Sequence, residues 1–348
     1  MMNNPQILNQ IVNENEKQAF KSMYSDMETG KAILNPEQLG TFLRAVEKDD
    51  PILSNASFEL MQRPRKLLNR VGIKGRVLQD GYKTGTDEAA HEINADPTAA
   101  QVNFGANELD VRKCRAMCEL TDDEKEDNIE QGRFEQTLLS MMGEAVGKDI
   151  SRTNVYSDKS LTGADALYTR RDGWLKLAEN QLKSKGVDST NGNFDVADGV
   201  TAIFDKMIYA LPSTFRDRSK LVFYVPFEIE DAYQNYLAKR NTTLGDANLV
   251  GKDQLAYKKI PVVGANILDD EEGRTINKGV SCLLTQPTNM AYGVHRNLTI
   301  EPERLPQYEM TRYWYGIRMD CDYYFRNAAV AAKITSAEAT ALPEASKA

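Results

Sequence analysis

The sequence predicts a fold of the α+β class, with α/β as the alternative, in a chain of 348 residues. Three observations indicate a mixture of helices and strands. A long helical pattern covers residues 121–148, helices and strands are mixed between residues 195 and 268, and strand-like segments dominate from Val280 onward. Such a mixture excludes a simple helical bundle and a simple β-sandwich.

The first part of the chain is predicted to contain two helices. One covers residues 1–33, and the next begins at Asn35 as cap with Pro36 at the first helical position, until Asp49-Asp50-Pro51 ends it. These helices have little means of forming a core by themselves. We therefore predict an N-terminal arm that packs on another surface.

Residues 67–120 are predicted to form a protruding hairpin. Two strand-like stretches, around Val71 to Leu78 and from Val102 to Cys118, enclose a segment rich in Gly, Thr, Asp and Pro. Loops of this length are uncommon in compact domains and usually serve a function. We therefore expect two extended arms joined by a long polar tip.

The longest helix signal covers Thr121 to Lys148. Thr121 and Glu124 form a capping box, and Asp122 and Asp123 suit the positive end of the helix dipole. Apolar residues then recur at mostly helical spacing, at Ile129, Phe134, Leu138, Met141, Met142, Ala145 and Val146. The pattern predicts a helix that lies over a surface at its charged end and enters a core at its apolar end.

The remainder of the chain is predicted in order as follows. Residues 149–195 are irregular apart from a helix over residues 175–185, which Asp172-Gly173-Trp174 introduces. An amphipathic helix covers residues 195–215, and a buried strand, a helix and a further strand region follow, at 220–226, 228–240 and 260–268. The last residues, 335–348, are rich in Ala, Glu and Ser and predict a loosely held tail.

Composition excludes several classes of protein. The net charge of −8 argues against binding driven by neutralisation of nucleic-acid phosphates, although passive contact with DNA stays possible. Two distant histidines, His91 and His295, leave little room for histidine-based catalysis or metal binding. No apolar run reaches the roughly 20 residues of a membrane helix. The N-terminus lacks the pattern of a signal peptide, so the four cysteines are expected to be reduced, partly buried thiols.

A search for catalytic or binding motifs finds no convincing site. Gly143 to Asp149 resembles a phosphate loop only superficially, because the spacing is short by one residue and Asp replaces the required Ser or Thr. A glycine at the end of the helix is the favoured interpretation. Cys114 and Cys118 have no second pair for zinc and are expected on one strand face as small hydrophobic residues. Pairing of cysteines between subunits is the minor alternative.

Three other groups of residues favour structural roles. The acids Asp269, Asp270, Glu271 and Glu272 are typical of a solvated turn, and His295 is expected to be a satisfied polar residue at a strand edge. The aromatic residues between Tyr308 and Phe325 suit a core or a subunit interface better than a ligand groove. The sequence therefore predicts no catalytic, cofactor-binding or metal-binding residues.

Taken in order, these segments resemble the major capsid protein of tailed bacteriophages of the Hong Kong 97 type. The resemblance covers nearly the whole chain and is carried by an ordered set of weak motifs: Leu34 to Gln38 running into Asp50 to Ser54, the hairpin of residues 71–118, Glu126 to Glu130 in a spine helix, Asp172-Gly173-Trp174 with the block 200–268, and the closing strands through Arg326. The resemblance implies an α+β capsid fold with five characteristic parts and a tail. These are an N-terminal arm (1–70), an extended loop (71–119), a spine helix and peripheral domain (120–194), an axial domain (195–300), further peripheral-domain strands (301–334) and a C-terminal tail (335–348).

The resemblance implies a structural function without catalysis. Subunits would form pentamers and hexamers of an icosahedral head that encloses double-stranded DNA, with the extended loop reaching over a neighbour. Further partners would be scaffold, portal and decoration proteins, without a membrane. The site of action would be the virion capsid, after assembly in the host cytoplasm.

Two features of some family members are not carried over. Lys83 lies near the loop tip, but the closing strands lack an Asn and Glu motif for a lysine–asparagine crosslink between subunits. The short stretch before the hairpin favours a separate scaffold protein over a scaffolding segment that is removed. The alternatives to a phage head are an encapsulin-like cargo shell, then a soluble α+β enzyme, then a simple binding module.

Overall fold

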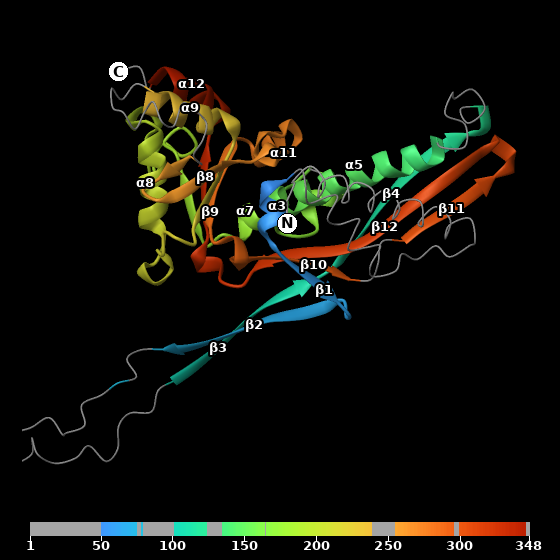
Figure 1. Ribbon diagram of the computed structural model, residues 1–348, viewed down its shortest axis with the longest axis horizontal. Coiled ribbons are helices and arrows are strands. Elements are labelled where there is room, and N and C mark those ends of the chain that lie inside the picture. The colour runs from blue at the N-terminus through green and yellow to red at the C-terminus, as the bar shows by residue number, and fades with distance from the viewer. Residues whose placement is uncertain are drawn as a thin grey trace, which may run out of the picture.

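A computed structural model of the chain describes residues 50–74, 78, 101–123, 134–163, 165–238, 255–295 and 299–345. The helices predicted over residues 1–33 and after Asn35, the tip of the hairpin and residues 124–133 of the predicted long helix lie outside these residues. Thr121, the predicted cap of that helix, is instead the last residue of strand β4 (Arg112–Thr121). In the described part, two sheets meet around a common core, and a two-stranded hairpin projects away from them (Figure 1).

The first sheet has six strands and is called the helix-flanked sheet. Its strands lie in the order β5 (Asn180–Lys183), β13 (Val330–Ile334), β9 (Val280–Thr285), β6 (Val222–Val225), β8 (Ile260–Gly264) and β7 (Ala256–Tyr257). The pairs β5–β13 and β6–β8 are parallel, and the other neighbours are antiparallel. Three helices, α8 (Val200–Ala210), α9 (Phe227–Ala238) and α12 (Ser336–Ala345), pack on one face (Figure 1).

Both faces of this sheet are buried, which explains its continuous apolar strands. Successive side chains of a strand point to opposite faces, so Phe223 and Val225 contact the three helices while Tyr224 faces the other core. The apolar residues predicted for the amphipathic helix are all buried on the helical side: Val196, Val200, Ile203, Phe204, Met207, Ile208 and Leu211. The prediction of a helix and a buried strand here is confirmed.

The second sheet has five strands and is called the long-strand sheet. Its central strand, β12 (Met310–Tyr323), pairs on one side with β10 (Met290–His295) and β11 (Thr299–Leu305) and on the other with β4 (Arg112–Thr121). Strand β1 (Ser57–Met61) adds to β10 in parallel. The alternating burial of β12 places Tyr313, Tyr315 and Ile317 in the core, so the predicted aromatic cluster is a core element in part, whereas Tyr308 and Phe325 at its ends are exposed.

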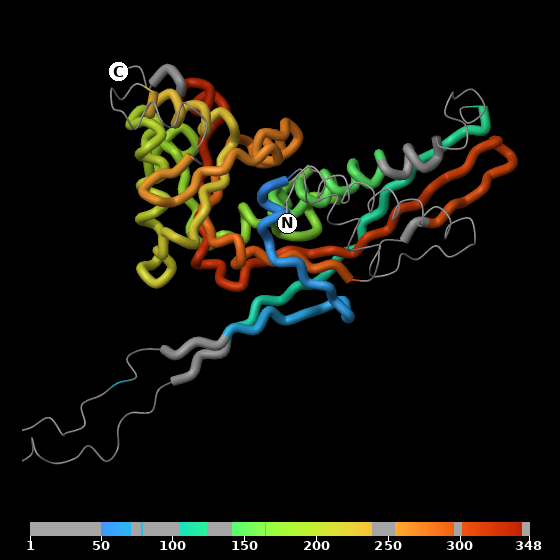
Figure 2. The backbone as a smooth tube through the Cα atoms, viewed as in Figure 1, coloured from blue at the N-terminus to red at the C-terminus, as the bar shows by residue number. Residues whose placement is uncertain are grey.

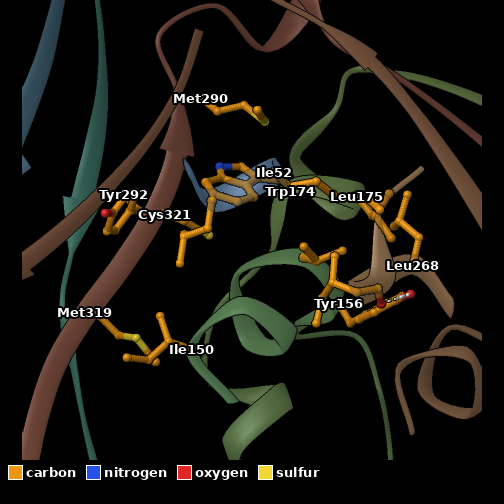
Figure 3. Packing of buried hydrophobic residues seen from close by; sticks show 14 of the residues in the cluster. Ile52, Ile150, Tyr156, Trp174, Leu175, Leu268, Met290, Tyr292, Met319 and Cys321 are labelled. Atoms are coloured by element: carbon orange, nitrogen blue, oxygen red, sulfur yellow. Dashed lines mark hydrogen bonds between the residues drawn. The ribbon is translucent and has the colours of Figure 1, made fainter. Parts of the chain in front are cut away.

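Helix α5 (Phe134–Tyr156) runs beside the long strands and enters the core at its C-terminal end (Figure 1). Trp174 is completely buried there, near Ile52 and Leu175 in Figure 3. Its indole N–H donates to the carbonyl oxygen of Asp322 at 3.4 Å, and the Tyr156 hydroxyl donates to the carbonyl of Ile267 at 3.0 Å. The core is thus closed by aromatic side chains whose polar atoms bond to backbone.

The short elements connect these layers. They are α3 (Pro51–Asn55), α6 (Ala166–Thr169), α7 (Trp174–Leu177), α11 (Glu271–Asn277) and the 3-10 helices η3 (Val196–Asp198), η4 (Ser213–Phe215), η5 (Asn266–Asp269), η6 (Pro287–Asn289), η7 (Pro306–Tyr308) and η8 (Arg326–Ala328). Asp50 caps α3 by accepting from the N–H of Ile52 at 2.9 Å. Gly273 in α11 lies against the ring of Tyr156, where a Cβ would be 2.1 Å from the nearest ring carbon.

Several predictions about local structure are wrong. The long helix does not end near Lys148 but continues to Tyr156, because Val146, Ile150 and Val155 keep one face in the core. The region 149–195 is therefore less irregular than expected. The predicted loose tail contains α12, which is held by buried Ala339 and Leu342 against the other helices. Glu338 also accepts hydrogen bonds from Ser184 at 2.5 Å and from the N–H of Gly186 at 3.0 Å.

The predicted linear boundaries at residues 70, 119, 194, 300 and 334 do not match the sheets. The chain crosses between the two sheets, as Figure 2 shows by residue number. β1 falls in the predicted arm and β4 mostly in the predicted loop, yet both belong to the long-strand sheet. β10 also joins that sheet, whereas β5 and β13 join the helix-flanked sheet. The reason is that these strands pair with partners distant in sequence, which local pattern does not reveal.

Candidate assembly interface

The projecting hairpin is the main candidate for an interface. Its strands β2 (Arg65–Lys74) and β3 (Gln101–Asp110) pair antiparallel over ten residues each, from Arg65 opposite Asp110 to Lys74 opposite Gln101. Within the described residues, neither strand forms a ladder with a further strand. An isolated two-stranded ribbon is marginally stable in water. Beyond its base, the hairpin would therefore gain stability from contact with a surface outside the subunit.

The base of the hairpin is anchored to the end of β12. The Asp110 N–H donates to Oδ2 of Asp320 at 2.7 Å, and Nδ2 of Asn107 donates to the carbonyl of Tyr323 at 2.5 Å. Leu68 and Leu109 are buried below these bonds against Met61. This arrangement gives the hairpin a defined direction relative to the long-strand sheet.

A second set of contacts links the hairpin to β1. Glu59 accepts a hydrogen bond from the Tyr324 hydroxyl at 2.8 Å and forms an ion pair with Lys66. Arg70 donates to the carbonyl of Tyr324 at 3.3 Å and lies over the ring of Phe325. These anchoring residues were not predicted from the sequence. Carboxylates within an aromatic strand, such as Asp320 and Asp322, were the signal that could have identified them, because acids are seldom buried without a partner.

Asp320 at this base is buried, and burial raises its pKa from 3.8 to about 6. The hydrogen bond from the Asp110 N–H and the positive charge of Arg171 act in the opposite direction. Since the folded protein binds the proton more tightly than the unfolded chain, Asp320 stabilises the fold most below about pH 4. That contribution is lost as the pH rises through about 6.

We therefore expect Asp320→Asn to be more stable than the unmodified protein at pH 7.5. The raised pKa predicts a gain on the order of 2–3 kcal/mol, which disappears near pH 4. Denaturant unfolding of dissociated subunits at pH 4.5, 6 and 7.5 measures it. Asp231→Asn, which removes an exposed carboxylate from α9, is the matched control. A loss of stability at pH 7.5 would show that the anchoring bond to Asp110 outweighs burial of the charge.

Exposed apolar side chains occur on the hairpin and on β1, the strand that precedes it in the sequence. β1 is at the edge of the long-strand sheet, and its Phe58 and Leu60 are 40% and 47% exposed. Leu67 on β2 is 55% exposed, and Leu78 is 83% exposed. Edge strands with exposed apolar residues readily pair with other chains. The edge of β1 and the hairpin together therefore suit contact with a neighbouring subunit.

The acidic segment Asp269 to Glu272 is not the solvated turn that the sequence predicted. Asp270 caps α11 and accepts a hydrogen bond from Arg152 of α5 at 2.6 Å, with its side chain 8% exposed. Arg152 also pairs with Glu272 at 3.0 Å. The hydrogen bonds from Arg152 and the N–H of Gly273 outweigh burial and lower the pKa of Asp270. This network holds α11 against α5 and has a structural role.

The other motifs have no catalytic geometry. Gly143 and Gly147 lie inside α5, so their N–H groups belong to a helix and cannot form a phosphate loop; the prediction of a terminal glycine is also wrong. Cys114 and Cys118 lie on β4 with their side chains packed against the core, as predicted, and His295 is buried at the end of β10. In the described part of the chain, no three His, Cys, Asp or Glu side chains gather to hold a metal ion. No helix there is both long and apolar enough to cross a membrane.

Comparison with known proteins agrees with this geometry. No family model matches the chain. The chain is 29% identical over 287 residues to "Putative prophage capsid protein YqbE" of Bacillus subtilis (strain 168), which covers 80% of this chain and 85% of that protein.

Solved structures show the same fold at low sequence identity. A chain of the satellite phage P4 procapsid that includes the size determination (Sid) protein matches with a TM-score of 0.57 and 11% identity, over 90% of this chain and 96% of that one. The capsid of a native GTA particle matches with a TM-score of 0.55 and 12% identity, over 81% and 89%. Mycobacterium phage Adephagia gives 0.53 and 11%, over 82% and 89%. The predicted α+β capsid fold of the Hong Kong 97 type and the resemblance to phage capsid proteins are confirmed.

Proposed function

We propose that this chain is a major capsid protein whose copies assemble into pentamers and hexamers of an icosahedral phage head around double-stranded DNA. The observation that carries the proposal is the hairpin β2–β3, which projects from the subunit without a further strand beside it in the described residues. A strand pair of this kind gains stability by lying on another chain. Head-to-tail contacts of identical subunits close into rings and shells.

The parts of the fold have separate tasks in this proposal. The helix-flanked sheet with helices α8, α9 and α12 is the axial domain, and copies of this domain meet around the symmetry axes. The long-strand sheet with α5 is the peripheral domain, and the hairpin reaches over a neighbouring subunit. The N-terminal arm, predicted over residues 1–70, would lie across adjacent subunits. Scaffold, portal and decoration proteins are the expected additional partners, and assembly takes place in the host cytoplasm.

The proposed role needs no catalytic step from this chain. Two buried carboxylates, Asp270 and Asp322, are each joined to an arginine, Arg152 and Arg326 respectively. Paired in this way, they stabilise contacts between elements and are not poised to attack a substrate. The assembly itself would supply the function.

The test is the assembly state of the purified full-length chain, expressed alone and together with its neighbouring genes. We expect closed particles tens of nanometres across, or free pentamers and hexamers, by sedimentation and negative-stain microscopy. Nuclease-protected duplex DNA in particles from the complete system would distinguish a phage head from a shell that contains protein cargo. A monomer or dimer under every condition would contradict the proposal.

A further inference from the structure

A cavity of about 230 Å³ lies between the C-terminal end of α5, helix α7 and the helix-flanked sheet. Its lining includes Ser157, Lys176, Lys183, Asn277 and Lys333. A water molecule occupies about 30 Å³ in the liquid, so the cavity has room for a small polyatomic ion with part of its hydration shell.

Two of the lysines face each other across paired strands. Lys183 of β5 is directly opposite Lys333 of β13 in the parallel ladder, and Lys333 is opposite Ser281 of β9. Like charges placed directly opposite in a sheet destabilise it. Among the described residues, neither ammonium group forms an ion pair with a carboxylate. The arrangement therefore places two ammonium groups close together, although the negative charges of Asp158 and Asp188 attract Lys333 and Lys183 in turn.

Further charges increase this imbalance. Burial lowers the pKa of Lys333, and the positive charges of Lys183, Lys278 and Lys176 lower it further, whereas the negative charge of Asp158 acts in the opposite direction. Asp158 lines the cavity, but it already pairs with Lys176 at 3.1 Å and accepts two hydrogen bonds from Ser160. An anion that enters the cavity would restore the charge balance of these lysines.

Neutral hydrogen-bond donors complete the lining. Ser157 is completely buried, and its hydroxyl has no hydrogen-bond partner in the described part of the chain. Ser281 accepts a hydrogen bond from Nδ2 of Asn277 at 2.6 Å, which leaves its own hydroxyl hydrogen for an acceptor. Ammonium groups and hydroxyls around one cavity suit an acceptor with several charged oxygens.

We propose that this cavity binds a phosphate group through Lys183, Lys333 and the hydroxyl of Ser157. Free inorganic phosphate suits the site better than a carboxylate because it offers more acceptor oxygens and can carry a second charge, whereas a phosphate of the DNA backbone carries a single charge. The group can come from free inorganic phosphate or from the backbone of DNA. The site itself depends only on the cavity, whereas DNA as the source rests on the proposed function.

The test titrates the full-length protein with inorganic phosphate by calorimetry, in chloride buffer of constant ionic strength, and records thermal unfolding in parallel. Phosphate at about 100 times its Kd is expected to raise the Tm by about 4 °C. Lys333→Met should abolish binding and this shift, yet raise the Tm in phosphate-free buffer, because a repelled, half-buried charge is removed. Ser157→Ala should weaken binding several-fold. Lys220→Met, which removes an exposed lysine paired with Asp217, is the matched control and should bind normally.

A 20-base-pair duplex provides the second arm of the test, with fluorescence anisotropy as the readout. Loss of duplex binding in Lys333→Met but not in Lys220→Met would identify DNA phosphates as the source, and phosphate binding without duplex binding would identify free phosphate. The proposal is overturned if phosphate does not bind, if Lys333→Met binds it as well as the unmodified protein does, or if acetate binds as tightly. Since these readouts do not require closed particles, they can fail independently of the assembly experiment.

Discussion

Replacing residues 75–100 by Asn-Gly is expected to yield a folded subunit that no longer closes into shells. Lys74 and Gln101 are directly paired, so a two-residue type I′ turn can join β2 to β3 without changing their register. The buried base of the hairpin, with Leu68, Leu109 and the bond from Asp110 to Asp320, remains intact. What is lost is the reach of the hairpin toward a neighbouring subunit.

The measurement combines circular dichroism with sedimentation and negative-stain microscopy of the same preparation. A control variant replaces residues 75–100 by a Gly/Ser segment of equal length. Comparison of the two variants separates the effect of the tip's length on shell closure from the effect of its sequence. We expect the shortened variant to unfold at the same denaturant concentration as dissociated unmodified subunits. Normal closed shells from the shortened variant would refute the role given to the hairpin.

The largest effect on stability is expected for Trp174→Ala. Trp174 is completely buried between α5, β12 and the helix-flanked sheet, and Tyr323 donates a hydrogen bond to its carbonyl at 3.0 Å. Truncation of a buried aromatic residue costs about 3–5 kcal/mol, because it removes apolar burial and leaves a cavity. The free energy of unfolding should fall by that amount in urea or guanidinium titrations of dissociated subunits.

The chain provides its own control, because its second tryptophan is Trp314. Trp314 is only partly buried on the long-strand sheet, and its indole N–H donates to Glu303 at 2.9 Å, in an exposed hydrogen bond. Trp314→Ala should therefore cost about 1 kcal/mol. Equal losses for both variants would contradict the view that the core around Trp174 joins the two sheets. Subunits must be kept dissociated, since assembly itself would add to the apparent stability.

Local elements with strong periodicity were predictable. The amphipathic helix that begins near Val200 and the buried strand at Val222 to Val225 lie where their apolar patterns placed them. The ordered series of segments also led to the capsid fold. The hypothesis of assembly came from that resemblance, and the hairpin was recognised from its length and composition.

Pairing between distant segments was not predictable from the sequence. Lys183 and Lys333 meet only because β5 and β13 are adjacent. Likewise, β4 pairs with β12 although the two strands are far apart in the chain. Similarly, nothing near Asp269 to Glu272 indicates that Arg152 of α5 lies beside them. Such contacts depend on side chains that are far apart in the chain, and local spacing carries no information about them.

The sequence by itself determined the class of the fold, the long helix, the hairpin and the absence of a recognisable catalytic motif, because periodicity, capping and turn residues act over a few neighbouring positions. Only the tertiary structure decided where the hairpin is anchored, that residues 336–345 form a packed helix, and that lysines gather around a cavity. The physical reason is that burial and charge balance at these places arise when two sheets and α5 are brought together.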